Sequence, residues 1–163
     1  MIRIGTLEPK HWPQVKSIYE EGIQTGNATF QQQAPEWENW NEDHLQHSRI
    51  VALDNDEVGG WAALSPVSER CVYAGVAEVS VYVAEKFRGK KIGTLLLKQL
   101  IAQSEINGIW TLQSGIFPEN VASIKLHEAN GFRIVGYREK VGQMNGVWRD
   151  TTLLERRSKL IGK

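Results

Sequence analysis

The chain has 163 residues, a mass of 18.4 kDa, and nineteen basic residues that balance nineteen acidic ones. This length predicts one domain with a core large enough to need no metal or disulfide. Zero net charge argues against nucleic-acid binding, which usually needs a basic excess. With no apolar run of about 18 residues and no signal-peptide pattern, neither a membrane partner nor secretion is expected. The single cysteine, Cys71, predicts a small buried side chain and a cytoplasmic location.

Strand-like and helix-like segments alternate along the chain. The first half predicts a strand at 1–7, a helix around Pro13 that Gly22 and Gly26 stop, a loop at 25–34, a helix at 35–48, and a hairpin of strands 50–53 and 58–64. The second half predicts a loop at 65–75, a strand at 76–83, a helix at 92–107, a strand at 109–116, a helix at 120–130, and strands 132–141 and 147–154 joined through Asn145-Gly146. This order predicts a mixed α/β fold with a right-handed parallel crossover.

The most informative segment is a basic, glycine-containing turn, Phe87–Thr94, between a strand and a helix. Glycines allow a ligand to approach the backbone, and the first N–H groups of a helix attract anions. The turn is therefore interpreted either as a cradle for a diphosphate or as a plain basic turn before a surface helix. Its spacing matches neither the nucleoside-triphosphate loop nor the dinucleotide fingerprint.

This turn resembles motif A of the GNAT acetyltransferases, Arg/Gln-x-x-Gly-x-Gly/Ala, which grips the pyrophosphate of acetyl-CoA. Arg88 and Gly93 match its first and last positions, whereas Lys91 replaces the middle glycine, which is acceptable if its backbone angles are helical. Further matches resemble the phosphinothricin acetyltransferase branch: they are the segments 25–30, 77–83, 120–132 and 141–150. The resemblance implies one GNAT domain over residues 1–163, with a central mixed, twisted sheet of about seven strands flanked by about four helices.

The resemblance also implies acetyl-CoA as co-substrate and assigns residues to it. The backbone of Val81, Tyr82 and Val83 would pair with the pantetheine arm as an extra strand. The pyrophosphate would be held by Arg88, Gly89, Lys90, Lys91, Ile92, Gly93 and Thr94. Asn120 and Ser123 would lie beside the thiol end. No metal is expected, because His44 and His47 lack further ligands at metal-binding spacing.

Two residues are implied in catalysis. Glu78 would act as the base, because an α-amine with a pKa near 8 is largely protonated at pH 7 and must lose a proton before it attacks. A partly buried carboxylate can take that proton directly or through water; the alternative is a solvent-facing glutamate at the start of a strand. His127 stands where many GNAT enzymes carry a tyrosine that protonates the leaving thiolate, and it either donates a proton or only packs beside CoA.

The acceptor side is assigned by resemblance to Thr29, Phe30, Ser68, Arg70, Tyr73, Glu78, Val79 and Ser80. Arg70 would pair with an α-carboxylate, and Phe30 would form either a pocket wall or part of the core. The expected activity is acetylation of the α-amine of a small amino acid or toxic analogue, such as phosphinothricin, methionine sulfone, methionine sulfoximine or arsinothricin, by a detoxifying or resistance enzyme. The alternatives are a peptide N-terminal acetyltransferase and a non-catalytic acyl-CoA sensor. A homodimer is expected from the resemblance.

Overall fold

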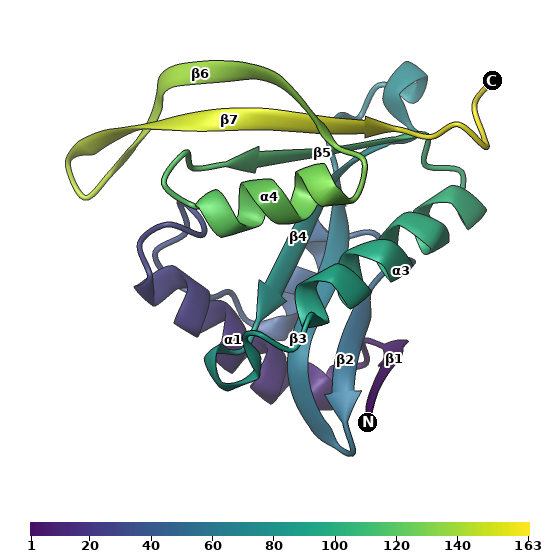
Figure 1. Ribbon diagram of the computed structural model, residues 1–163, viewed down its shortest axis with the longest axis vertical. Coiled ribbons are helices and arrows are strands. Elements are labelled where there is room, and N and C mark those ends of the chain that lie inside the picture. The colour runs from purple at the N-terminus through teal and green to yellow at the C-terminus, as the bar shows by residue number, and fades with distance from the viewer.

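The computed structural model describes all residues, 1–163, and its centre is a seven-stranded mixed sheet (Figure 1). The strand order is β1-β2-β3-β4-β5-β7-β6, and β4 and β5 are the parallel pair. The strands are β1 Ile2–Thr6, β2 Ile50–Asp54, β3 Glu57–Pro66, β4 Val76–Val83, β5 Thr111–Ile116, β6 Arg133–Met144 and β7 Val147–Arg157. Their order along the chain confirms the predicted alternation, including a parallel crossover through one helix.

Four α-helices flank the sheet, as expected. They are α1 Trp12–Gln24, α2 Trp37–Asp43, α3 Ile92–Ile106 and α4 Val121–Ala129, with short 3-10 turns at Pro9–His11, Cys71–Tyr73 and Glu85–Phe87. Gly108 and Gly131 follow α3 and α4 with φ of 81° and 89°. This left-handed conformation ends a helix and suits glycine, which explains why both helices stop here. None of the helices is long and apolar enough to cross a membrane.

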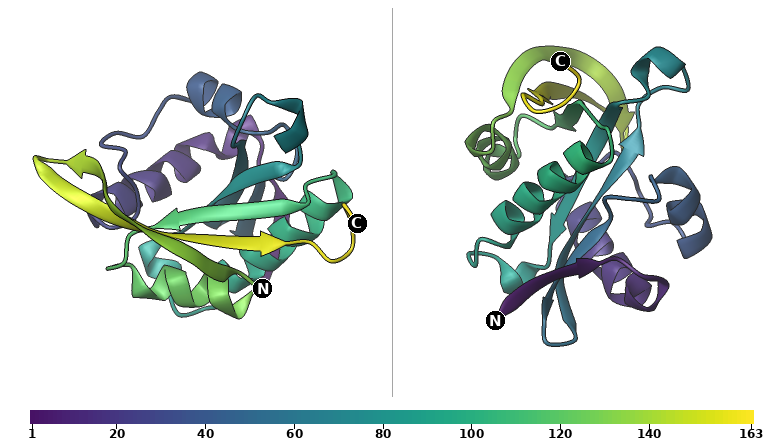
Figure 2. Two further views of the ribbon diagram at one scale, coloured as in Figure 1. Left: turned by 90° about the horizontal axis from the view of Figure 1, so that it is seen from above. Right: turned by 90° about the vertical axis from the view of Figure 1, so that its right-hand side faces the viewer.

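The core lies on both faces of β3. Every residue from Val58 to Leu64 is buried, which requires a cover on each side of the strand. Figure 2 shows α3 against one face and α1 with α2 on the other. On the second face the Trp61 ring packs against Trp40 and is stacked with Tyr19 and Tyr82, with centroids 5.6, 5.6 and 4.9 Å away. The aromatic cluster links the sheet to both helices.

β4 and β5 pair over only three residues. Their register joins Val76–Glu78 to Thr111–Gln113, after which the two strands separate (Figure 1). Beyond that point β4 continues beside β3 as far as Val83, and β5 continues beside β7 as far as Ile116. Each strand therefore follows the twist of its other neighbour, and a V-shaped opening forms inside the sheet.

Two predicted features at the N-terminal helices are wrong. The second helix ends at Asp43 rather than at residue 48, because buried Arg49 draws the carbonyls of His44 and Leu45 to its guanidinium at 3.1 and 2.9 Å. Gly22 does not stop the first helix, which continues to Gln24. It instead gives room to a neighbour, because a Cβ there would lie 2.6 Å from the Tyr82 ring.

Two side chains of kinds that are often buried face solvent. Cys71, which was expected to be buried, is exposed in the loop before β4. Trp148 is 56% exposed near the tip of the β6–β7 hairpin. The hairpin is longer than predicted, since β6 reaches Met144 and β7 reaches Arg157. Its outer half extends beyond the helices that would cover it (Figure 2).

Substitution of Gly22 by alanine should destabilise the protein. Alanine gains about 1 kcal/mol of helix propensity, but overpacking costs about 1–3 kcal/mol where neighbours cannot move. Tyr82 is stacked between Tyr19 and Trp61 at 5.0 and 4.9 Å, so its ring has little freedom to retreat. We expect a net loss of about 1 kcal/mol in the free energy of unfolding, measured with urea. Gly136→Ala, where a Cβ meets no atom within 4 Å, is the matched control and should unfold like the parent.

Candidate active site

A cavity of about 430 Å³ opens where β4 and β5 separate. Glu78–Tyr82 line it from β4, Ser114–Ile116 from β5, and Ala28–Gln31 from the loop after α1. Asn120, Ser123 and His127 reach it from the start of α4, at helix positions that share one face. The cavity therefore joins strand, loop and helix residues that lie as far apart in the sequence as Tyr19 and Thr151.

Glu78 occupies the last paired position before β4 and β5 separate. Its register partner is Gln113, whose Nε2 donates to the Glu78 carboxylate at 3.4 Å. The carboxylate lines the cavity but is exposed, so the expected partial burial is wrong. At this rim the carboxylate is in contact with water and faces the cavity, which allows a proton to pass to it through solvent.

His127 lies in the opposite environment, with 3% of its surface exposed. Its Nδ1 is 2.7 Å from the carbonyl oxygen of Ser123, which can only accept, so Nδ1 carries the hydrogen. Nε2 is buried without any partner. Desolvation lowers the pKa of His127 below its ordinary value of 6.5, against the opposing effect of the Ser123 carbonyl. At neutral pH the ring is therefore uncharged and presents a lone pair, not a hydrogen, at Nε2.

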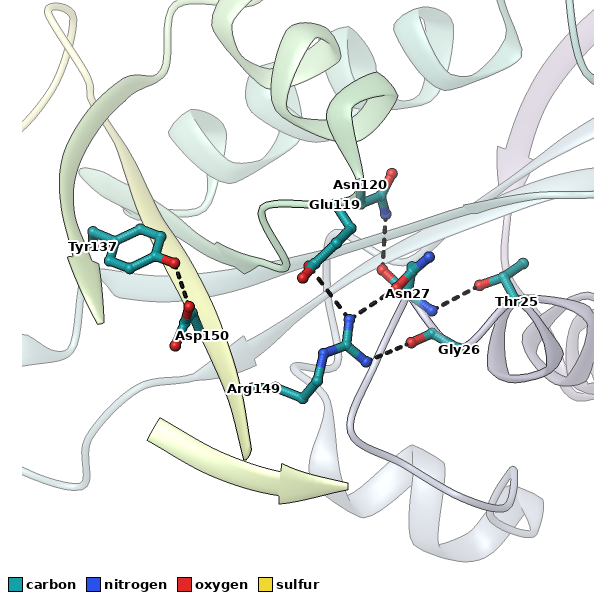
Figure 3. Close-up of polar contacts among 8 residues, drawn as sticks. All are labelled: Thr25, Gly26, Asn27, Glu119, Asn120, Tyr137, Arg149 and Asp150. Carbon is teal, nitrogen blue, oxygen red and sulfur yellow. Dashed lines mark hydrogen bonds and ion pairs between the residues drawn. The ribbon is translucent and has the colours of Figure 1, made fainter. Parts of the chain in front are cut away.

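Asn120 has two structural tasks at the start of α4. Its Oδ1 accepts from the N–H of Ser123 at 3.3 Å and so caps the helix. Its Nδ2 donates to the carbonyl of Asn27 at 3.1 Å, which joins the helix to the loop after α1 (Figure 3). Asn120 and Ser123, which were both predicted to lie beside the thiol end, line the cavity.

The basic turn leads into α3 without a side-chain cap. The first N–H groups of the helix, from Ile92 onward, have no intrahelical partner and receive no side-chain acceptor from Lys91. Gly89 adopts φ of 80° with open space beside it. Gly93 allows α3 and α4 to approach, because a Cβ there would lie 3.1 Å from Leu126. Uncapped amides beside Arg88, Lys90 and Lys91 are suited to hold an anion.

Lys91 does not have the right-handed helical backbone angles that most readily accommodate a non-glycine residue. Its φ of 61° and ψ of 24° are left-handed. This region costs a non-glycine residue about 1–2 kcal/mol. The strain gives a physical reason for the glycine that the resembled motif carries at this position.

β4 offers a backbone edge toward the opening. On one side its residues Val79–Val83 pair with β3, and on the other side they have no strand partner once β5 has separated. Val81, Tyr82 and Val83 lie along this free edge, between Glu78 and the basic turn. A linear, amide-bearing chain can add to such an edge as a strand does. The edge and the uncapped helix start therefore fit the two chemically distinct parts of acetyl-CoA.

The acceptor-side predictions divide into two groups. Thr29, Phe30, Val79 and Ser80 line the cavity together with Glu78. Ser68, Arg70 and Tyr73 do not line it; they belong to the loop that precedes β4, where the Arg70 guanidinium lies 5.6 Å from the centre of the Tyr73 ring. The predicted partner for an α-carboxylate is thus outside the cavity wall.

Sequence reasoning missed several cavity residues. Tyr19, Trp40, His44 and Phe117 add an aromatic wall, and burial raises the pKa of the Tyr19 and Tyr82 hydroxyls, which keeps both neutral. The apolar spacing of Tyr19 and Trp40 is typical of core positions and gives no separate sign of a cavity. No group of three His, Cys, Asp or Glu side chains is placed to hold a metal ion.

The separated parallel strands, the uncapped helix start and the cavity form a site that can hold an acyl-CoA thioester. The family model described as "Acetyltransferase (GNAT) family" matches residues 12–132. The chain therefore belongs to the GNAT acetyltransferase family.

Three similar proteins illustrate the range of this family. An L-methionine sulfoximine/L-methionine sulfone acetyltransferase of Pseudomonas aeruginosa is 29% identical over 149 residues, 88% of this chain and 87% of its own. The structure of a ribosomal-protein-alanine N-acetyltransferase from Brucella melitensis has a TM-score of 0.87 at 29% identity, covering 96% of this chain and 99% of that one. That of a phosphinothricin acetyltransferase from Sinorhizobium meliloti, in complex with acetyl-CoA, has a TM-score of 0.86 at 27% identity, covering 96% and 88%.

His127 should contribute to acid sensitivity. Because its pKa is lowered by folding, the unfolded chain binds its proton more readily below about pH 6.5, and the free energy of unfolding falls as the pH falls. His127→Gln removes this titration, so its stability should decline less steeply between about pH 6.5 and pH 5 than that of the parent. Urea unfolding at several pH values measures the two slopes. Parallel curves for the two proteins would contradict the assigned neutral state.

Proposed function

We propose that this acetyltransferase transfers the acetyl group of acetyl-CoA to the α-amine of a small amino acid or a toxic amino-acid analogue. The observation that carries the proposal is the pair of proton acceptors in one cavity: the exposed carboxylate of Glu78 and the buried, unpartnered Nε2 of His127. The names of the similar proteins from Pseudomonas and Sinorhizobium support an amino-acid analogue of the methionine sulfone, methionine sulfoximine or phosphinothricin type.

In this proposal acetyl-CoA lies along the V-shaped opening. The backbone of Val81–Val83 pairs with the pantetheine arm, and the amides and charges from Arg88 to Thr94 hold the pyrophosphate. Asn120 and Ser123 lie at the thioester end, because both line the same cavity as Glu78. Acetyl-CoA supplies the activated acetyl group, and the residues of the chain bind it, orient it and handle protons.

Glu78 acts as the general base. It takes one proton from the substrate ammonium, directly or through water at the exposed rim, and leaves an amine whose lone pair can attack the thioester carbonyl. An α-amine has a pKa of about 8, so most of it is protonated at neutral pH without this step. The attack is direct, with no acyl-enzyme, which leaves exposed Cys71 without a role.

His127 acts as a proton shuttle. Its neutral ring has no hydrogen at Nε2 to give, so it first accepts the extra proton that the nitrogen carries once the C–N bond has formed. The resulting imidazolium then passes that proton to the sulfur as the C–S bond breaks. This order differs from direct donation by a resting acid and follows from the hydrogen bond that holds Nδ1.

The acceptor is bound on the side of the cavity formed by Thr29, Phe30, Val79 and Ser80. In this proposal Ser68, Arg70 and Tyr73 complete the acceptor site, and a two-pronged contact between Arg70 and the α-carboxylate requires the guanidinium to leave the Tyr73 ring. The Brucella neighbour names a peptide-type acceptor as the rival. Residues Ala28–Gln31, which close one side of a 430 Å³ cavity, favour a small molecule over a peptide.

We further propose a cytoplasmic detoxifying or resistance enzyme that forms a homodimer. The single cysteine suits a reducing compartment. Exposed apolar side chains gather on the β6–β7 hairpin: Ile134, Val135, Tyr137, Val141, Val147 and Trp148. A patch of this kind favours contact with another protein surface. Sedimentation should give twice the 18.4 kDa chain mass, and Trp148→Lys should shift the protein toward monomer.

Glu78→Gln tests the proposed function. Turnover should fall by about 10²-fold or more at pH 7 while acetyl-CoA binding is retained, because the amide cannot accept the proton. The loss should shrink at about pH 9, where most of the amine has already lost its proton. Glu139→Gln, which changes an exposed carboxylate on β6 that does not line the cavity, is the matched control and should retain the parent's rate.

Thiol release from acetyl-CoA is the measurement, with methionine sulfone, methionine sulfoximine, phosphinothricin, ordinary L-amino acids and an alanine-initiated peptide as acceptors. Release that depends on one free amino acid supports the proposal. Release with the peptide alone moves the function to the rival. Tight acetyl-CoA binding without release, unchanged in Glu78→Gln, indicates a sensor.

A further inference from the structure

Arg149 connects the hairpin to the loop that closes the cavity. Its guanidinium donates to the carbonyl of Gly26 at 2.9 Å and to Oδ1 of Asn27 at 2.8 Å, and it reaches Glu119 at 3.4 Å (Figure 3). The same group lies 4.0 Å from the centre of the Phe117 ring. Its side chain is only 13% exposed, which is low for an arginine on a strand near a hairpin tip.

The loop has few other polar ties to the second half of the chain. Three hydrogen bonds reach residues 26 and 27 from there, two from Arg149 and one from Asn120. The backbone hydrogen bonds within the loop are local: Asn27 N–H donates to Thr25, and Gln31 N–H donates to Thr29. Further along the loop, the Thr29 side chain interacts with the hydroxyls of Tyr19 and Tyr82. Removal of Arg149 therefore leaves one of the three distant hydrogen bonds at residues 26 and 27.

Arg149 does not line the cavity, but Phe117, which it contacts, and the residues that follow its other contacts do. Ala28–Gln31 follow directly on Asn27, and Asn120 follows directly on Glu119. Phe117, under the guanidinium, lines the cavity and packs edge-on against Phe30 at 4.8 Å. Phe30 also rests over Gly142, where a Cβ would lie 2.9 Å from its ring. The guanidinium thus supports the acceptor wall through its contacts with the loop at residues 26 and 27, with Glu119 and with Phe117.

We propose that Arg149 is a positioning residue that holds residues 26–30 closed over the acceptor side of the cavity and thereby sets the affinity for the amine. This inference rests on the proposed function for its kinetic part. A loop that is already ordered saves the entropy that binding would otherwise spend on ordering it. A saturating acceptor can still close a loosened loop, so the Michaelis constant should change more than turnover.

The test compares the parent with Arg149→Met, which keeps the long apolar stem, and Arg149→Lys, which keeps the charge. Lysine lacks the fork that reaches Gly26 and Asn27 together. Arg133→Met is the matched control, because Arg133 is an exposed arginine on the same hairpin with an ion pair to Glu155 and no contact with the loop. All variants are first compared by thermal unfolding.

With L-methionine sulfone as acceptor, Arg149→Met should raise the acceptor KM by about tenfold and change kcat by less than about threefold. The KM for acetyl-CoA should stay within about twofold, since the pyrophosphate turn and the free edge of β4 do not touch Arg149. The acceptor KM of Arg149→Lys should lie between that of the parent and that of Arg149→Met. In a double-mutant cycle, adding Asn27→Ala to Arg149→Met should raise the acceptor KM little further. Both substitutions remove the same contact between Arg149 and Asn27.

A second readout needs no turnover. Hydrogen exchange of the amides at residues 26–31 should be faster in Arg149→Met than in the parent or Arg133→Met, with exchange elsewhere unchanged. Unchanged loop exchange in a folded Arg149→Met variant overturns the inference, and so does an equal rise in both Michaelis constants. If no free amino acid is acetylated by the parent, the proposed function fails, and loop exchange with acetyl-CoA bound still decides whether Arg149 holds the loop.

Discussion

The short parallel contact between β4 and β5 is the constraint on which the rest of the site depends. β4 is paired with β3 as far as Val83, and β5 with β7 as far as Ile116, so each strand follows a different neighbour after Glu78. The separation leaves one backbone edge of β4 without a strand partner and opens the cavity beside it. Because Glu78 is the last paired residue, the same geometry places its carboxylate at the point where the opening begins.

Around this opening the two proton-handling residues lie in contrasting environments. Glu78 is exposed and can exchange protons with water, whereas His127 is buried and held in one tautomer by the Ser123 carbonyl. Burial lowers the pKa of His127 and so keeps a lone pair available at neutral pH. A water-exposed acceptor suits the ammonium that enters from solvent, and a dry acceptor suits a proton that stays within the reacting groups.

The acceptor wall depends on contacts between distant parts of the chain. The loop after α1 has no regular structure and depends for its position on Asn120 at the start of α4 and on Arg149 in β7. Asn120 also caps α4, so the helix that carries His127 and the loop that carries Phe30 share one anchor. The aromatic stack of Tyr19, Tyr82 and Trp61, with room provided by Gly22, supports the opposite side.

The sequence by itself determined the order of strands and helices, because this order depends on local spacing. Through its resemblance to a family, it also indicated ten of the 23 residues that line the cavity. Asn120, Ser123 and His127 recur at helical intervals, and Gly108 and Gly131 end helices through their own backbone conformation. Only the tertiary structure decided where α2 ends, why Gly22 is needed, that Lys91 is left-handed, and that Arg70 lies outside the cavity. Only the tertiary structure revealed the tautomer of His127 and the hydrogen bonds from Arg149 to the loop after α1. Each of these is set by atoms that meet only after folding, such as the His44 carbonyl at Arg49 or Asn27 at Arg149, and no local pattern records such meetings.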